Sequence, residues 1–215
     1  MLDCRGVTRF FGPWPALREV SFRLPAGALV LLLGPNGAGK STLLHILAGA
    51  LRASDGQVEI EGIAIGEARA RQRVGLLAHR SLLHPDLTVR ENLAHYAALY
   101  GFPGAEVAAG LARVRADSFA DVPVGELSQG MRQKAALARA LLHSPQVLLL
   151  DEAFSSLDHR TVEEMRGILQ AFRAEGRTIL ASTHSEGQLS DFADGALELD
   201  RGRLVQGRGC MEAGR

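Results

Sequence analysis

The strongest chemical signal in the sequence is the stretch Gly34–Thr42, which reads GPNGAGKST. It fits the pattern G-x-x-x-x-G-K-[ST] and stands between an apolar run at residues 29–33 and a helix-like apolar period at residues 43–47. Glycines let successive backbone N–H groups turn inward around an anion, and a helix start adds its dipole. Lys40 supplies a mobile positive charge, and the Ser41 hydroxyl can serve a Mg²⁺ ion bound to a nucleotide. An ordinary glycine-rich turn is the alternative, but the complete pattern predicts a nucleoside triphosphate site.

Two adjacent carboxylates, Asp151 and Glu152, follow another apolar run at residues 147–150. Acidic groups at the end of a buried strand are costly unless they have partners or a function. Ligands of open α/β sheets bind at the carboxyl ends of the strands, so this pair should face the phosphate loop. We expect Asp151 on the Mg²⁺ side and Glu152 as the base for an attacking water molecule. Two surface-turn acids are the alternative.

Three weaker signals lie elsewhere. Phe10 and Phe11 offer rings on which a flat base can stack, although strand packing explains them equally well without a phosphate site. Ser128 and Gly130 open a long helix and form a candidate anion seat, but capped helices commonly begin this way. His184 follows an apolar run at residues 178–182, and at the end of a core strand it is expected to contact phosphate.

Elements of an α/β fold must position these residues. Apolar runs at 29–33, 74–78, 147–150 and 178–182 indicate buried strands, residues 57–61 alternate like an edge strand, and 196–205 indicate a closing hairpin. Residues 80–145 are mostly helical and include a capping box at Thr88 and Glu91. We predict a P-loop NTPase core with a mostly parallel sheet, an N-terminal antiparallel β part and an inserted α-helical lobe. One domain, 1–215, would comprise a core of 1–79 and 146–215 and a lobe of 80–145.

Composition disfavours several classes of function. The 215 residues contain 24 lysines plus arginines and 24 aspartates plus glutamates, so no net charge favours nucleic acid or membrane lipid as a partner. Cys4 and Cys210 lack metal-ligand spacing and favour free thiols in a reducing compartment. The first residues lack the apolar core of a signal peptide, and no run approaches ~20 apolar residues. We therefore expect a cytoplasmic protein whose membrane role would depend on a partner.

In their order and separation, the motifs resemble those of the nucleotide-binding subunit of an ATP-binding-cassette (ABC) transporter. GPNGAGKST resembles the Walker A motif, LSQGM the signature, LLLDEAFSSLD the Walker B motif with the D-loop, and STH the segment with the switch histidine. The resemblance covers essentially the whole chain. It implies an ATPase that uses ATP and Mg²⁺, forms a head-to-tail dimer with a second copy, and drives a membrane-spanning subunit from the inner face of the cell membrane.

The same resemblance implies roles for individual residues. Phe11 would stack on adenine, and Asp158 would communicate across the dimer. Ser128 and Gly130 would contact the γ-phosphate bound to the other copy. Lys40, Glu152 and His184 would be catalytic, with Glu152 polarising water and His184 sensing the γ-phosphate. The nucleotide would be held by Gly34, Asn36, Gly37, Ala38, Gly39, Lys40, Ser41 and Thr42.

Three residues depart from the family pattern. His79 stands where a glutamine usually contacts Mg²⁺ and water; a neutral imidazole can also bind a metal or water, but it titrates near pH 6.5, so coupling here is expected to be altered or pH-sensitive. Ala153 replaces a proline, and Gln129 is a mild change in the signature. ATPases that resemble the haem exporter of cytochrome c maturation often carry histidine at this place. Haem export is therefore one hypothesis for the transported substrate.

Other functions stay open at this point. An exporter of a drug, lipid or polysaccharide would use the same motor, and a soluble scaffold ATPase would use the same cassette. Repair members of the family carry long heptad insertions and translation factors carry two cassettes, and neither feature occurs in these 215 residues. A cassette that binds ATP without hydrolysis is disfavoured by the intact Lys40, Asp151, Glu152 and His184. A coupling helix of the membrane partner is expected to dock near residues 79–93.

Overall fold

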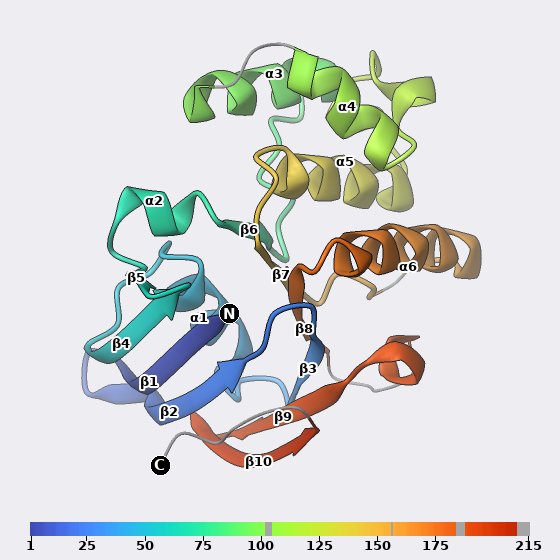
Figure 1. Ribbon diagram of the computed structural model, residues 1–215. Coiled ribbons are helices and arrows are strands. Elements are labelled where there is room, and N and C mark those ends of the chain that lie inside the picture. The colour runs from blue at the N-terminus through green and yellow to red at the C-terminus, as the bar shows by residue number, and fades with distance from the viewer. Residues whose placement is uncertain (102–104, 156, 184–187, 210–215) are drawn as a thin grey trace.

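The computed structural model describes residues 1–101, 105–155, 157–183 and 188–209, which form two sheets and a set of helices (Figure 1). The small sheet is antiparallel, in the order β2-β1-β4-β5, and the large sheet has the order β10-β9-β3-β8-β7-β6. The strands are β1 (Leu2–Phe11), β2 (Trp14–Leu24), β3 (Leu29–Leu33), β4 (Asp55–Ile60), β5 (Ile63–Ala64), β6 (Val74–Leu77), β7 (Val147–Asp151), β8 (Thr178–Ser182), β9 (Gly195–Asp200) and β10 (Arg203–Gly209).

The large sheet is the middle layer because its strands are apolar on both faces. Strands β6, β7, β8, β3 and β9 run parallel, and β10 returns antiparallel to β9. Along β3, Leu29 and Leu31 pack toward the helices α3 (Val89–Tyr100), α5 (Gln129–Leu141) and α6 (His159–Ala174). Val30 and Leu32 point the other way, into a cluster with α1 (Lys40–Leu47) and the small sheet. Alternate burial on two faces explains why the strand reads as one continuous apolar run.

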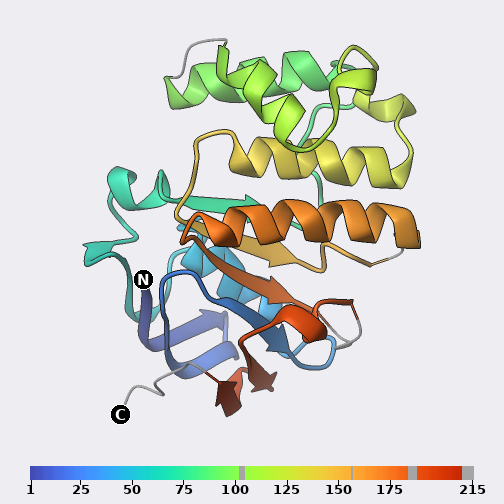
Figure 2. The ribbon, with the colours of Figure 1, turned by 45° about the vertical axis from the view of Figure 1, so that its right-hand side comes forward.

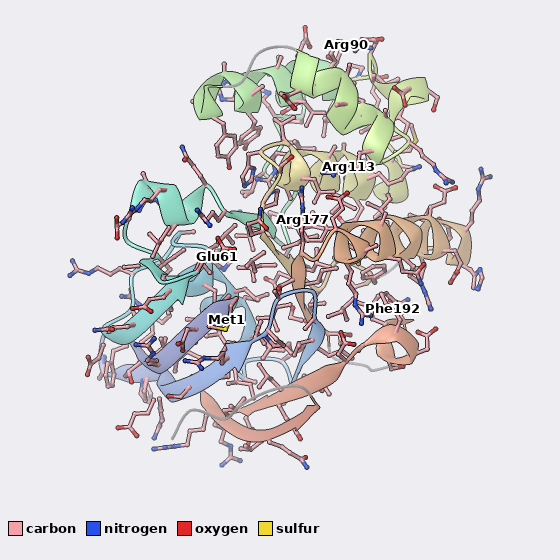
Figure 3. All side chains as sticks on the ribbon, viewed as in Figure 1. Met1, Glu61, Arg90, Arg113, Arg177 and Phe192 are labelled. Atoms are coloured by element: carbon pink, nitrogen blue, oxygen red, sulfur yellow. The ribbon has the colours of Figure 1, made fainter. Side chains whose placement is uncertain are left out.

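The helices on one side of the large sheet form successive layers (Figure 2). Helix α5 lies against β6 and helix α6 against β8, and α3 with α4 (Ala105–Arg113) lies outermost. Arg113, labelled in Figure 3, forms an ion pair of 3.0 Å with Glu175, directly after α6, and so ties the outermost layer to the innermost. The short helix α2 (Ala68–Arg71) precedes β6, and the described residues include 3₁₀ helices at Asp117–Phe119, Val124–Glu126 and Ser190–Phe192.

The predicted α/β fold is confirmed, with its parallel sheet, its antiparallel N-terminal part and its helical insertion. The capping box of α3 is present, since the Thr88 hydroxyl accepts the Glu91 N–H and the Glu91 carboxylate accepts the Thr88 N–H. The division at residues 80 and 145 stays a prediction. Among the described residues, none of the helices has the length and apolar character needed to span a bilayer.

One strand prediction is wrong. Residues 57–61 were expected at the edge of a sheet, but β4 lies between β1 and β5. The turn at Glu61 and Gly62, both with positive φ, folds two residues back so that Ile63 pairs with Ile60. Two such residues make the tight hairpin turn that suits strand twist. A two-residue partner strand leaves too little periodicity to be recognised in the sequence.

Candidate nucleotide-binding site

A cleft of about 640 Å³ opens at the carboxyl ends of β3, β6 and β7. Its volume lies within the range of small-molecule sites in proteins. Parallel strands end at the same edge of the sheet, and the residues that follow them meet there. The cleft brings together most of the predicted loop, the histidine after β6 and the two acids at the end of β7, namely Asn36, Gly37, Ala38, Gly39, Lys40, Ser41, Thr42, His79, Asp151 and Glu152.

The first turn of α1 is built without a side-chain cap. Its N-cap is Gly39, with φ of 107°, and no side chain accepts a hydrogen bond from the turn. A Cβ on Gly39 would come within 2.7 Å of the Ala16 carbonyl oxygen, so this position has no room for a side chain. Gly37 also has positive φ, but an added Cβ there would meet open space. The free N–H groups of the first turn and the helix dipole therefore face the cleft as a seat for an anion.

Lys40 is held beside this seat. Only 6% of the residue is exposed, and its Nζ donates to the carbonyl oxygens of Gly34 at 2.6 Å and Pro35 at 3.1 Å. The same Nζ lies 4.0 Å from Oε1 of Glu152. Gly34 itself does not line the cleft; its carbonyl orients the lysine. An ammonium has three donors, so two bonds to the loop leave one for a phosphate oxygen.

The two acids at the end of β7 are held by a serine that the sequence patterns did not single out. Ser182 ends β8, directly opposite Asp151, and its hydroxyl donates to Asp151 Oδ1 at 2.8 Å. The hydroxyl oxygen of Ser182 also accepts the Glu152 N–H at 3.0 Å. Glu152 has φ of 51°, which is uncommon for a residue with a side chain and clusters at functional sites. The hydroxyl of Ser155 donates to the Glu152 carbonyl at 2.9 Å and completes the support.

Ser41 and Asp151 supply hard oxygen donors to the cleft. Mg²⁺ prefers oxygen ligands and keeps several waters or substrate phosphate oxygens, so two protein oxygens fit a magnesium ion that arrives with a nucleotide. The described residues contain no cluster of three or more His, Cys, Asp or Glu side chains suited to a metal. His79 is exposed and lines the same cleft.

Three predicted residues lie outside the cleft and have structural partners in their own chain. Ser128 caps α5, and its hydroxyl accepts the Met131 N–H at 3.3 Å. Asp158 caps α6 through Thr161, accepting its N–H at 3.0 Å and its hydroxyl at 2.7 Å, and these bonds lower the pKa of Asp158. A Cβ on Gly130 would lie 2.8 Å from Oγ1 of the same threonine. The starts of α5 and α6 therefore pack together as one group away from the cleft.

Phe11 lies at the end of β1 and does not line the cleft. The residue is 47% exposed, and the guanidinium of Arg9 sits 4.7 Å from its ring centroid. Its cross-strand partner is Trp14, which is 77% exposed. Two exposed rings at the tip of a hairpin are available for stacking, so the adenine role of Phe11 stays a prediction. His184 lies outside the described residues.

Comparison with known proteins identifies the family. Residues 17–155 match the family model described as ABC transporter. The chain belongs to the ABC transporter family. It is 37% identical over 211 residues to "Nod factor export ATP-binding protein I" of Burkholderia lata, covering 95% of this chain and 69% of that protein. It is 34% identical over 205 residues to "ABC transporter ATP-binding protein NatA" of Bacillus subtilis, covering 92% and 83%.

A solved ABC cassette agrees in three dimensions. It is a dimeric ATP-binding cassette in a post-hydrolysis state with ADP and Pi, and it superposes with a TM-score of 0.87 at 25% identity, covering 97% of this chain and 98% of that chain. This ABC protein is accordingly an ATPase, the motor subunit of a transporter. Similar proteins also include "Sulfate/thiosulfate import ATP-binding protein CysA" of Burkholderia mallei, at 38% identity over 219 residues, covering 95% of this chain and 61% of that protein. Since both exporters and importers are similar, family membership does not select a substrate.

Proposed function

We propose that two copies of this ABC ATPase close head to tail on two ATP molecules and reopen after hydrolysis, driving a membrane-spanning partner. The observation that carries the proposal is the division of the predicted site. The cleft holds Lys40, Asp151 and Glu152, whereas Ser128 and Gly130 lie outside it in the same chain. A second copy can bring its own α5 start to this cleft, and the likeness to a cassette solved as a dimer with ADP and Pi supports that arrangement.

In this proposal the triphosphate occupies the start of α1. Backbone N–H groups and Lys40 bind its oxygens, and Phe11 stacks on the adenine. Ser41 and Asp151, with His79 beside them, would hold Mg²⁺, which neutralises phosphate charge when bound. Ser128 of the second copy would donate its hydroxyl to the γ-phosphate while still accepting its own cap bond. A serine hydroxyl can do both, because it has one donor and two acceptor lone pairs.

Hydrolysis then needs one base and several fixed charges. Glu152 accepts a proton from a water molecule, the water oxygen attacks the γ-phosphorus, and the bond to the ADP oxygen breaks. Lys40 stabilises the charge that moves onto the leaving oxygen, and His184 senses the γ-phosphate. The strained backbone of Glu152 supports a catalytic role, because such conformations persist only where surrounding contacts hold them.

The membrane partner would dock beside residues 79–93. Hydrogen bonds from α3 hold the backbone of this segment, because the buried amide of Asn92 donates to the carbonyl oxygens of His84, Leu87 and Thr88. Tyr96 donates to the carbonyl oxygen of Leu82 at 2.5 Å, and Leu82 is 51% exposed next to the cleft. A rigid loop with an exposed apolar side chain suits a coupling helix. Through it the protein would lie on the inner face of the cell membrane.

Replacing the base tests the motor directly. Glu152→Gln keeps the size of the side chain but removes its basicity, so kcat should fall by about 10²–10⁴-fold with ATP affinity preserved. The variant should accumulate as a dimer in ATP, measured by size-exclusion chromatography, and Lys40→Ala in the same background should stay monomeric. Wild-type hydrolysis at full rate by a monomer at high dilution would contradict the proposal.

For the transported substrate, we propose haem export in cytochrome c maturation on the basis of His79 alone. The exporters among the similar proteins support the direction, and the similarity to CysA makes sulfate import the competing assignment. A drug, lipid or polysaccharide would need the same motor. The membrane subunit that co-purifies with this chain should be reconstituted in vesicles and its ATPase activity measured with haem, sulfate and a lipo-oligosaccharide. Stimulation by haem supports the proposal, and stimulation by another compound alone overturns it.

A further inference from the structure

Strand β6 ends the large sheet, and its free edge faces α5. Carbonyl groups on an edge strand need other partners when they are buried. Two side chains of α5 and the residues after it supply them. Arg139 donates from Nη2 to the Leu76 carbonyl oxygen at 2.6 Å, and His143 meets the Val74 carbonyl oxygen with Nε2 at 3.0 Å. Because a carbonyl only accepts, His143 carries its proton on Nε2.

The strand lies directly against the helix between these two bonds. A Cβ on Gly75 would come within 2.3 Å of the Ala140 carbonyl oxygen, so only glycine allows this approach. The geometry is regular. Four residues at helical rise, such as those from Arg139 at the end of α5 to His143 just after it, advance about 6 Å, and two strand residues advance about 6.6 Å. The helix and the strand, running in opposite directions, can therefore match contacts at both ends of β6.

These contacts are buried and packed from the side by α3. Arg139 and His143 are 7% and 8% exposed. Arg139 lies 5.3 Å from the ring centroid of Tyr96, and His143 stacks on Tyr100 with ring centroids 4.5 Å apart. Within the described part of the chain, Nε of Arg139 and Nδ1 of His143 have no hydrogen-bond partner. Burying a guanidinium without a carboxylate is a poor way to gain stability, since apolar packing serves as well. A positioning function accounts for it better.

Arg139 and His143 join β6 to α5, and we call this pair of contacts the clamp. Each of these two elements leads to a residue that the proposed dimer needs. After β6 the chain continues through Ala78 to His79 in the cleft, and Ser128 is the N-cap residue of α5. We propose that Arg139 and His143 are positioning residues that lock β6 to α5, so that His79 in one nucleotide site and Ser128, directed at the other site, move as one unit. This inference rests on the proposed head-to-tail dimer. Closure around one ATP would then be transmitted to the second site.

The test compares Arg139→Met with Arg139→Lys and with Lys134→Met. Lys134 lies on the same helix, is partly buried and pairs with Glu164 of α6 at 2.9 Å, so it is a control for the loss of a cation from α5. For Arg139→Met we expect kcat to fall by about 2- to 30-fold, the usual range for residues that carry coupling. The Hill coefficient for ATP should fall toward 1, and the ATP Kd of the monomer should stay within about 2-fold of wild type. Arg139→Lys keeps a donor and should restore part of both, and Lys134→Met should change neither.

Further measurements separate the outcomes. Urea denaturation identifies a variant that fails to fold, and His143→Phe, which keeps the stack on Tyr100 but loses the bond to Val74, then replaces it. If Arg139→Met and His143→Phe fold and keep the wild-type kcat and Hill coefficient, Arg139 and His143 have no positioning role. The conclusion is the same if Lys134→Met lowers kcat as much as Arg139→Met does. If Glu152→Gln does not dimerise in ATP, the proposed function fails first; if it dimerises and the clamp variants behave as wild type, only this inference fails.

Discussion

The backbone N–H groups in the first turns of α1 and α5 differ in their partners: a side chain caps α5 and none caps α1. Helix α1 starts after Gly39 with no side-chain cap and opens onto the cleft, whereas α5 starts after Ser128, whose hydroxyl caps it. Helices α3 and α6 resemble α5 in this respect, because the side chains of Thr88 and Asp158 cap them. Uncapped N–H groups at a helix start are an anion seat, while capped ones are already partly satisfied. The start of α1 therefore has free N–H groups that can bind phosphate within one chain, whereas the start of α5 has a side-chain partner in its own chain and needs no ligand for it.

The largest effect should follow from removing the charge at α1. Lys40→Ala should weaken ATP binding by about 100-fold, because a hydrogen bond to a charged phosphate is among the strong ones. The free energy of unfolding should fall by about 1–3 kcal/mol, because the carbonyl oxygens of Gly34 and Pro35 lose the donor that Lys40 supplies. Titration calorimetry with ATP and thermal melting measure the two quantities. Arg69→Ala, which removes a surface cation on α2, is the control. Wild-type affinity in Lys40→Ala would mean that the α1 start does not hold the nucleotide.

A smaller effect is expected at the strand end that faces α1. Ser182→Ala removes the hydroxyl shared by Asp151 and Glu152, so we expect kcat to fall about tenfold, as a buried group left unsatisfied costs about 1–3 kcal/mol. Thr178→Val is the matched control, because Thr178 lies on the same strand and donates to Pro25 at its far end. Steady-state hydrolysis of the two variants decides the point. Equal losses would reduce Ser182 to a structural role.

Two substitutions of Ser128 can separate its role as the cap of α5 from its proposed role in the ATP-bound dimer. Ser128→Ala should lower the free energy of unfolding by about 1 kcal/mol through loss of the cap, whereas Ser128→Asn should keep it, because asparagine caps equally well. Both should impair ATP-dependent dimers in the Glu152→Gln background, since neither has the hydroxyl. Urea denaturation and size-exclusion chromatography give the two readouts. A dimer of normal affinity with Ser128→Asn would show that the hydroxyl is dispensable.

The sequence predicted the features whose residues lie close together along the chain. The phosphate loop and the capping box of Thr88 and Glu91 lie within a few residues, so the sequence contains their full geometry. The role of Ser182 was not predictable, because it depends on the pairing of β8 with β7. The bonds of Arg139 and His143 to β6 join residues 63 and 69 positions apart. A polar residue on an apolar helix indicates a buried partner but does not identify it.

The smallest predicted effect concerns the other end of α5. Burial lowers the pKa of His143 below its usual value, while the unfolded chain titrates near 6.5. As pH falls below 6.5, the unfolded state binds a proton that the folded state does not, so stability declines by at most about 1.4 kcal/mol per pH unit. Urea denaturation at pH 7.5 and 5.5 should show a shallower decline for His143→Phe than for wild type.

The sign of this effect tests how α5 is built. A charged histidine near the carboxyl end of a helix is normally favoured by the helix dipole, which would raise the pKa and make the protein more stable at low pH. At His143 the desolvation by Tyr100 and β6 is the larger influence, because the ring is buried and only Nε2 has a partner among the described residues. If wild type and His143→Phe lose stability equally between pH 7.5 and 5.5, the ring is hydrated in solution. The carboxyl end of α5 would then exclude water less completely than the burial of His143 in the structure indicates.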